Sequence, residues 1–168
     1  MRVWIAALAL ILGTTFSAPP APAHEIEAGD ITIVHPRARP NLPNRPTAAY
    51  MAILNEGAEG DRLMAARAEA FEVIEMHRSM KHGDAMHMEP VEAIAVDADS
   101  IALLEPGGLH LMLFGAKERF KPGDEFRMVL SFEKAGDVEI SVKVEKISGG
   151  AEHDHDDHSG HNHGSTTN

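Results

Sequence analysis

The most informative absence in this sequence is cysteine, since none of its 168 residues is one. A chain without cysteine forms no disulfide and offers no thiolate to a metal. This excludes zinc-thiolate sites and the cysteine ligand that a blue-copper centre needs. It also leaves no cysteine for a lipid anchor.

Basic residues are scarce as well. Fifteen lysines and arginines stand against 26 aspartates and glutamates, which gives a formal charge of −11 at pH 7. Such an acidic surface repels nucleic acid and anionic lipid, so neither is expected as a partner. Neither Ser79 nor Ser131 has a base and an orienting group that the sequence can identify, so hydrolase chemistry is not expected and the chain is interpreted as a binding protein, not an enzyme.

Long apolar runs are missing too. Residues 3–13 are apolar, but this run is too short for a membrane span, which takes about 20 residues. It follows Arg2 and precedes a proline-rich stretch that ends in Ala21-Pro22-Ala23, an arrangement typical of a signal peptide. We therefore expect a signal peptide over residues 1–23, cleavage near Ala23, and a periplasmic protein that begins at His24 and has no stable membrane insertion.

Two further parts are expected: a β domain over residues 24–148 and a polar, histidine-rich tail over residues 149–168 that is disordered without metal. Residues 126–132 and 138–144 alternate apolar and polar side chains with the period of half-buried strands. Other strands are expected at 30–35, 48–55, 62–68, 71–79, 85–91, 100–104 and 109–115. Residues 62–70 are equally compatible with a helix. Many short strands separated by turn signals predict an antiparallel sandwich or small barrel.

What the chain has in abundance is methionine and histidine, in one place. Residues 76–88, MHRSMKHGDAMHM, contain four methionines and three histidines. Thioether sulfur is soft and neutral and favours Cu(I), while imidazole binds both oxidation states of copper. Methionine also fills cores, and we assign Met51, Met64 and Met128 to packing. A polar hairpin tip around residues 81–84 offers little burial, so this cluster is interpreted as a ligand supply.

His110 and Met112 form a second soft pair. With the two-residue period of a strand they project from one face, while Leu109, Leu111 and Leu113 point to the other. One imidazole beside one thioether provides half of a metal site, and the hairpin would provide the other half. The alternative is an ordinary half-buried histidine next to a core methionine.

The spacing of these residues is H-x10-M-x21-H-x-M, from His77 through Met88 and His110 to Met112. It resembles the pattern of the periplasmic PCuAC-type copper chaperones. The resemblance covers nearly the whole domain and includes AGDITIVHP, AAYMAILNEGAEGDRL, VIEMHRSM, PGGLHLML and FEKAGDVEISVKVE. One departure is Arg37, because the family often has an aromatic residue after the HP dipeptide.

This resemblance implies a cupredoxin-like Greek-key β-barrel with a solvent-accessible Cu(I) site built from His77, Met88, His110 and Met112. It also implies a copper chaperone that serves the binuclear CuA centre of cytochrome c oxidase. The expected partner is the CuA subunit of the oxidase or another periplasmic copper chaperone, and the chain is expected to be a monomer. Two other functions stay open: a periplasmic copper or zinc buffer without a dedicated acceptor, and a copper oxidoreductase.

Other methionines and histidines of the cluster are ranked by the face they share. Met86 lies on the same face of a strand as Met88 and is the best substitute ligand. Met76 faces away from His77 and is expected to pack inward. His82 and His87 are interpreted as exposed bystanders or weak secondary ligands.

The tail is a separate metal-binding feature. It interleaves aspartates with five histidines: His153, His155, His158, His161 and His163. These borderline and hard donors favour Cu(II), with Zn(II) and Ni(II) as competitors. We expect the tail to capture Cu(II) and pass it to the Cu(I) site after reduction by an outside electron source. A solvated acidic tail with no metal role is the alternative.

Overall fold

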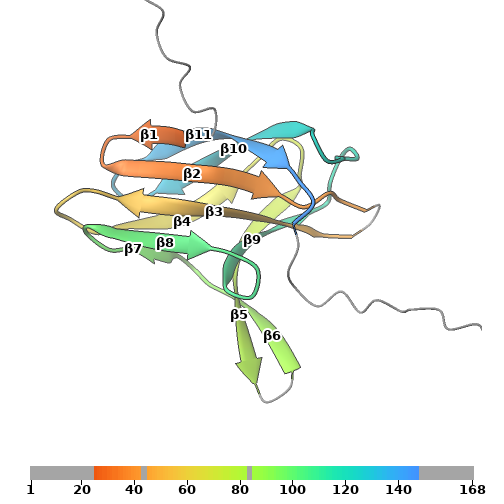
Figure 1. Cartoon of the computed structure of the whole chain (residues 1–168), viewed down its shortest axis with the longest axis horizontal. Helices are drawn as coiled ribbons and strands as arrows, with labels where there is room; N and C mark the ends of the chain where they lie inside the picture. Colours follow the sequence, from red (N-terminus) through yellow and green to blue (C-terminus); the bar gives the residue numbers. More distant parts are fainter. Residues whose placement is uncertain (1–24, 43–44, 83–84, 148–168) are drawn as a thin grey trace, which may run out of the picture.

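Every regular element of the computed structural model is a β-strand, within the residues that the structure describes (25–42, 45–82 and 85–147; Figure 1). The eleven strands are β1 (Glu25–Ala28), β2 (Ile31–Ala38), β3 (Thr47–Asn55), β4 (Asp61–Arg67), β5 (Val73–His82), β6 (Ala85–Pro90), β7 (Ile94–Val96), β8 (Ser100–Leu104), β9 (Leu109–Phe114), β10 (Glu125–Phe132) and β11 (Asp137–Val144). Among these residues there is no helix with the length and apolarity that crossing a bilayer would take.

Nine of these strands match predicted segments, because their sequences alternate with the two-residue period. The helical alternative for residues 62–70 is wrong: β4 is a strand whose Leu63 is fully buried while Arg62 and Met64 are exposed. Two strands, β1 and β7, are missing from the prediction. Both are short, and their position in the sheet is set by hydrogen bonds to a neighbouring strand: β1 pairs with β2, and β7 pairs with β4.

The strands form one mixed sheet in the order β6-β5-β9-β8-β3-β2-β11-β10-β4-β7, with β1 paired to β2 and an additional pairing of β9 with β3. Most pairs are antiparallel, but β2 with β11 and β8 with β9 are parallel. The sheet curls until β4 contacts β5 and β7 contacts β8, so its two halves enclose a single core. The predicted all-β class is thus confirmed.

The inner faces of the strands supply this core. Its fully buried side chains include Ile33, Ile53, Leu111, Leu113 and Met128. Met51 also lies in the core, as predicted, but Met64 is 40% exposed, so its assignment to packing is wrong.

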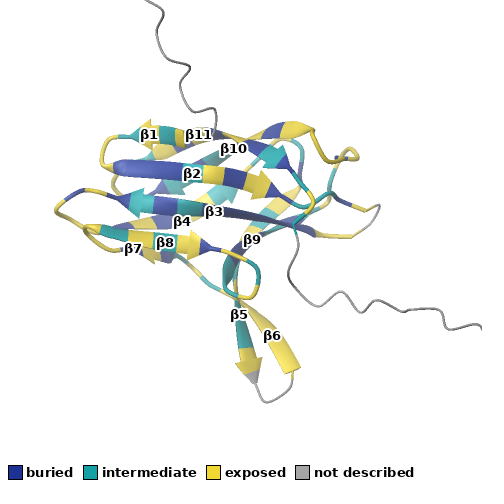
Figure 2. Ribbon diagram, viewed as in Figure 1, coloured by how far each residue is buried: buried dark blue, intermediate teal, exposed yellow. Residues whose placement is uncertain are grey.

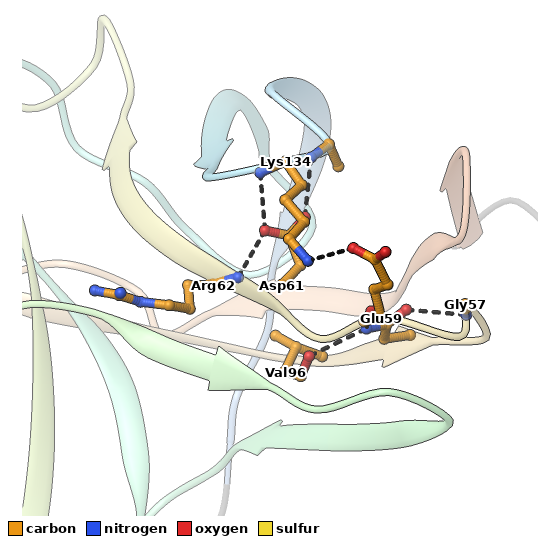
Figure 3. Close-up of polar contacts among 8 residues, drawn as sticks. Gly57, Glu59, Asp61, Arg62, Val96 and Lys134 are labelled. Carbon is orange, nitrogen blue, oxygen red and sulfur yellow. Dashed lines mark hydrogen bonds and ion pairs between the residues drawn. The ribbon is translucent and has the colours of Figure 1, made fainter.

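One buried carboxylate joins β4 to the turn between β10 and β11 (Figure 3). Asp61 accepts hydrogen bonds from the backbone N–H groups of Arg62 at 2.7 Å and of Lys134 and Ala135 at 2.9 Å each. The Lys134 ammonium group in turn donates to Glu59 at 2.8 Å. These contacts tie the start of β4 to the turn between β10 and β11.

The β5–β6 hairpin, which carries the cluster of methionines and histidines, extends beyond the body of the sheet (Figure 1). Every residue of β6 is exposed (Figure 2). Because β5 pairs with β6 on one side and with β9 on the other, it links the methionines of the hairpin to His110 and Met112.

Candidate metal site

The site is centred on two histidines that face each other across neighbouring strands. His77 of β5 stands directly opposite His110 of β9 in the antiparallel register. Their ring centroids are 5.9 Å apart, and the planes are tilted by 46°. His110 is buried, with 4% of its surface exposed, and the His77 side chain is 14% exposed. The prediction that the site is accessible to solvent is therefore wrong for His110.

Both predicted thioethers lie on the same sheet face as this pair. Met112 is two residues beyond His110 on β9 and stands opposite Glu75, two residues before His77. Its neighbour on the other side is the small Ala48 of β3. Met88 stands opposite Ser79 on the far side of β5, one step nearer the hairpin tip than His77. Diagonal neighbours of this kind lie about 7–8 Å apart, within reach of long side chains.

The register of β5 with β6 also decides on which face of the hairpin the other residues of the cluster lie. Met86 stands opposite Lys81 and shares the face of Met88, as predicted for a substitute ligand. Met76 is buried and faces the core, also as predicted. His87 is exposed and stands opposite Met80 on the reverse face of the hairpin. The side chain of His82, His24 and the five tail histidines lie outside the described residues.

Hydrogen bonds hold each ring by one nitrogen. His110 Nδ1 lies 3.1 Å from the backbone oxygen of Gly108, and the same oxygen accepts the backbone N–H of Ser79 at 3.0 Å. His77 Nε2 lies 2.8 Å from Glu75 Oε2, and its Nδ1 is buried without a hydrogen-bond partner among the described residues.

Burial keeps His110 in the form that binds metal. Desolvation lowers the pKa of His110, and the neighbouring His77 lowers this pKa further, while the hydrogen bond to Gly108 acts in the opposite direction. The net result is a pKa below the ordinary histidine value. A neutral imidazole has one nitrogen lone pair to offer a cation, so this environment favours a ligand over a charged side chain.

The donors that meet here suit a soft ion. Within the part of the chain that the structure describes, no three histidine, aspartate or glutamate side chains gather so that they could hold a metal. The candidate site instead combines two imidazoles with thioethers. The buried Nδ1 of His77 has no hydrogen-bond partner among the described residues. This fits a role as a metal ligand, because a buried polar atom is normally paired.

The face that carries the site is also the most apolar exposed surface. Seven large apolar side chains are exposed among the described residues, and five of them lie on this face by their register: Val73, Met86, Met88, Ile101 and Leu103. The alternation of β3 continues the face from Ala48 past Tyr50 to Ala52, which stands opposite Leu103. An apolar surface around a metal site is typical of a docking area.

Sequence reasoning missed three groups of this site: the Glu75 carboxylate, the Gly108 carbonyl and the Tyr50 ring, whose centroid lies 6.4 Å from that of His110. Glu75 could have been found from the strand period, which places it on the face of His77. Gly108 and Tyr50 could not, since both depend on which strands become neighbours.

These features define a class first: an all-β domain with a methionine- and histidine-lined face. Comparison with known proteins then gives the family. The sequence pattern of the family described as "Putative lipoprotein LpqE-like" matches residues 31–144. A curated relative, "Putative lipoprotein Lxx21020" of Leifsonia xyli subsp. xyli, is 28% identical over 107 residues, which are 63% of this chain and 64% of the relative. The chain thus spans slightly less than two thirds of that relative.

Solved structures give the same answer. The copper-bound PCuAC domain of PmoF2 superposes with a TM-score of 0.63 at 31% identity and covers 73% of this chain and 97% of its own. The apo PCuAC domain of PmoF1 has a TM-score of 0.63 at 28% identity, with 73% and 98% covered. Apo-DR1885 of Deinococcus radiodurans, at 22% identity and a TM-score of 0.57 with 87% and 99% covered, shares the fold. The chain belongs to the LpqE-like, PCuAC-type family, and the predicted cupredoxin-like fold is confirmed.

Proposed function

We propose that this protein is a periplasmic copper chaperone that carries Cu(I) on His77, Met88, His110 and Met112. One observation carries the proposal: two imidazoles stand opposite each other on β5 and β9, and the flanking positions on the same side of the sheet hold thioethers. The copper-bound state of the PmoF2 domain, which is 31% identical, supports copper as the cargo.

The charge of the donor set favours the monovalent ion. Thioethers and neutral imidazoles bring no negative charge, so they match a soft ion with one positive charge better than a hard divalent one. Among the described residues, Glu75 is the carboxylate that contacts a proposed ligand, through its hydrogen bond to His77. No covalent bond of the protein has to form or break in this role, so carrying copper requires no enzymatic step.

Release of copper is favoured by where the ligands lie. Met88 is 60% exposed, so a ligand from an acceptor can displace this thioether first while the buried His110 and the half-buried His77 still hold the ion. The apolar face with Ile101 and Leu103 gives the acceptor a surface to dock on. The acceptor is the CuA subunit of cytochrome c oxidase or another periplasmic copper chaperone.

The chain would work outside the cytoplasm. Its signal-peptide-like residues 1–23 and the "lipoprotein" in the names of its relatives both support export. In the periplasm, the histidine-rich tail would capture Cu(II) through imidazoles and carboxylates, and an external reductant would convert it to the Cu(I) that the thioethers prefer.

Anaerobic X-ray absorption on the Cu(I)-loaded protein tests the core site. We expect both sulfur and nitrogen in the first shell of the wild type. In the double variant Met88→Leu, Met112→Leu, the sulfur shell should disappear, because leucine keeps the volume but offers no donor. The matched control is Met64→Leu, an exposed methionine on β4, which should leave the spectrum unchanged. A sulfur shell that survives the double variant would contradict the proposed ligand set.

A further inference from the structure

Glu75 occupies a special position beside the proposed copper ligands. It lies two residues before His77 on β5, so both side chains project from the same face, and it stands opposite Met112. Its Oε2 atom is 2.8 Å from His77 Nε2. The Glu75 side chain is 48% exposed, whereas the His77 side chain is only 14% exposed.

This contact decides which nitrogen of His77 carries the proton. A carboxylate only accepts hydrogen bonds, so the nitrogen that faces it must be the N–H donor. In a neutral imidazole the other nitrogen then holds the lone pair. That nitrogen is Nδ1, the buried atom that has no hydrogen-bond partner among the described residues.

His110 is held in the opposite way. Its Nδ1 faces the backbone oxygen of Gly108 at 3.1 Å, and a carbonyl oxygen can only accept. His110 therefore carries its proton on Nδ1 and its lone pair on Nε2. The two facing rings, 5.9 Å apart between centroids, thus present different nitrogens.

We infer that Glu75 is a positioning residue that fixes His77 as the Nε2–H tautomer, so that a soft monovalent cation is bound through Nδ1 of His77 and Nε2 of His110. This inference rests on the proposed function. A carboxylate on the distal nitrogen of a metal-bound histidine orients the ring and raises the basicity of the ligating nitrogen. The Glu75 charge, 2.8 Å from the His77 ring, would also offset part of the positive charge that the neutral ligands leave.

Nitrogen NMR of the full chain tests this assignment. Long-range proton–nitrogen correlations distinguish the two tautomers, and loss of a ring signal in His77→Ala assigns it. In the metal-free protein we expect the Nε2–H tautomer for His77 and the Nδ1–H tautomer for His110. Addition of silver(I), a soft and redox-inert probe, should shift Nδ1 of His77 and Nε2 of His110. An Nδ1–H tautomer at His77, or a silver-induced shift at its Nε2, would overturn the inference.

Two substitutions separate positioning from mere structural support. Glu75→Ala should give a mixture of His77 tautomers and weaken silver(I) and Cu(I) binding by roughly 10- to 100-fold, as for other partners of metal-bound histidines. Glu75→Gln keeps an oxygen that accepts the N–H, so it should restore the tautomer and most of the affinity. Glu89→Ala, an exposed carboxylate on β6, is the matched control and should change neither.

The outcomes also distinguish this inference from the proposed function. If Glu75→Ala keeps the wild-type tautomer and affinity, or binds the cation more tightly because the carboxylate competes with it, the inference is wrong and the chaperone role stands. If the wild-type protein does not bind silver(I) or Cu(I) at the two histidines, the proposed function itself fails.

Discussion

At the scale of single residues, the buried carboxylate of Asp61 holds the start of β4 to the turn between β10 and β11. Burial by itself raises the pKa of Asp61, but hydrogen bonds from the backbone N–H groups of Ala135, Arg62 and Lys134 and the charge of Lys134 outweigh it. The net pKa lies below the ordinary aspartate value. An ionised Asp61 therefore stabilises the folded state at pH values above the carboxyl pKa of the unfolded chain, and this contribution is lost as the pH falls through the lower folded pKa.

Replacement of this carboxylate gives a prediction with a defined pH dependence. Asp61→Asn should lower the free energy of unfolding by about 1–3 kcal/mol at neutral pH, because its amide group cannot accept all three backbone N–H groups. The difference from the wild type should shrink at acid pH, as the pH falls through the lowered folded pKa of Asp61 and the wild-type carboxyl also becomes neutral. Urea denaturation followed by circular dichroism at both pH values measures this.

The control for Asp61 is Glu139→Gln, which changes an exposed carboxylate paired with Arg127 and should change the unfolding free energy little at either pH. A loss of stability in Asp61→Asn that persists in full at acid pH would contradict the role given to the charge.

At the scale of elements, the β5–β6 hairpin depends on its alternation. All of β6 is exposed, so packing does not decide which face each side chain takes. The pairing of Ser79 with Met88 and of Lys81 with Met86 does so, and it places both thioethers on the face of His77. A shift by one residue would move them to the reverse face.

An exchange of Met88 and Glu89 tests this dependence without a change in composition or charge. The double variant Met88→Glu, Glu89→Met moves the thioether to the reverse face and puts a hard carboxylate in its place. Cu(I) affinity, measured by competition with a chromophoric chelator, should fall by at least about tenfold, while thermal unfolding stays unchanged because both positions are exposed. The single variant Glu89→Met, which adds a thioether but keeps Met88, should retain affinity. Unchanged affinity in the exchange variant would exclude Met88 as a ligand.

At the scale of the whole molecule, the chain divides its candidate metal donors between two parts. The β domain has thioethers with imidazoles, whereas residues 149–168 have imidazoles with carboxylates. The last strand, β11, ends at Val144, and the backbone N–H of Glu145 donates to Ala38 at 2.8 Å. The domain therefore completes its sheet before the tail begins.

Removal of the tail, residues 149–168, should separate Cu(I) binding by the β domain from Cu(II) capture by the tail. The shortened protein should fold with an unchanged circular dichroism spectrum and bind Cu(I) with wild-type affinity, because all four proposed ligands remain. Its Cu(II) stoichiometry, measured by electron paramagnetic resonance, should fall because the five tail histidines are gone. A Cu(II) stoichiometry equal to that of the full chain would reject the role of the tail in capture.

Much of the fold could be predicted from local patterns. The strict alternation in β10 and β11 identifies both strands, because a half-buried strand needs an apolar residue at every second position. The same period correctly placed Met76 in the core and Met86 on the face of Met88. It failed for β1 and β7, which are too short to show a pattern, and it left β4 undecided between strand and helix.

The sequence by itself determined the donor chemistry of this protein: without cysteine, only methionine sulfur can act as a soft ligand, and H-x10-M-x21-H-x-M fixes which side chains are candidates. The tertiary structure alone decided that β9 lies beside β5, which brings His110 opposite His77 and buries it. It also decided that Glu75 and the Gly108 carbonyl each face one ring nitrogen. Such neighbours come from strand pairing between distant segments, and a local period carries no information about which strands will pair.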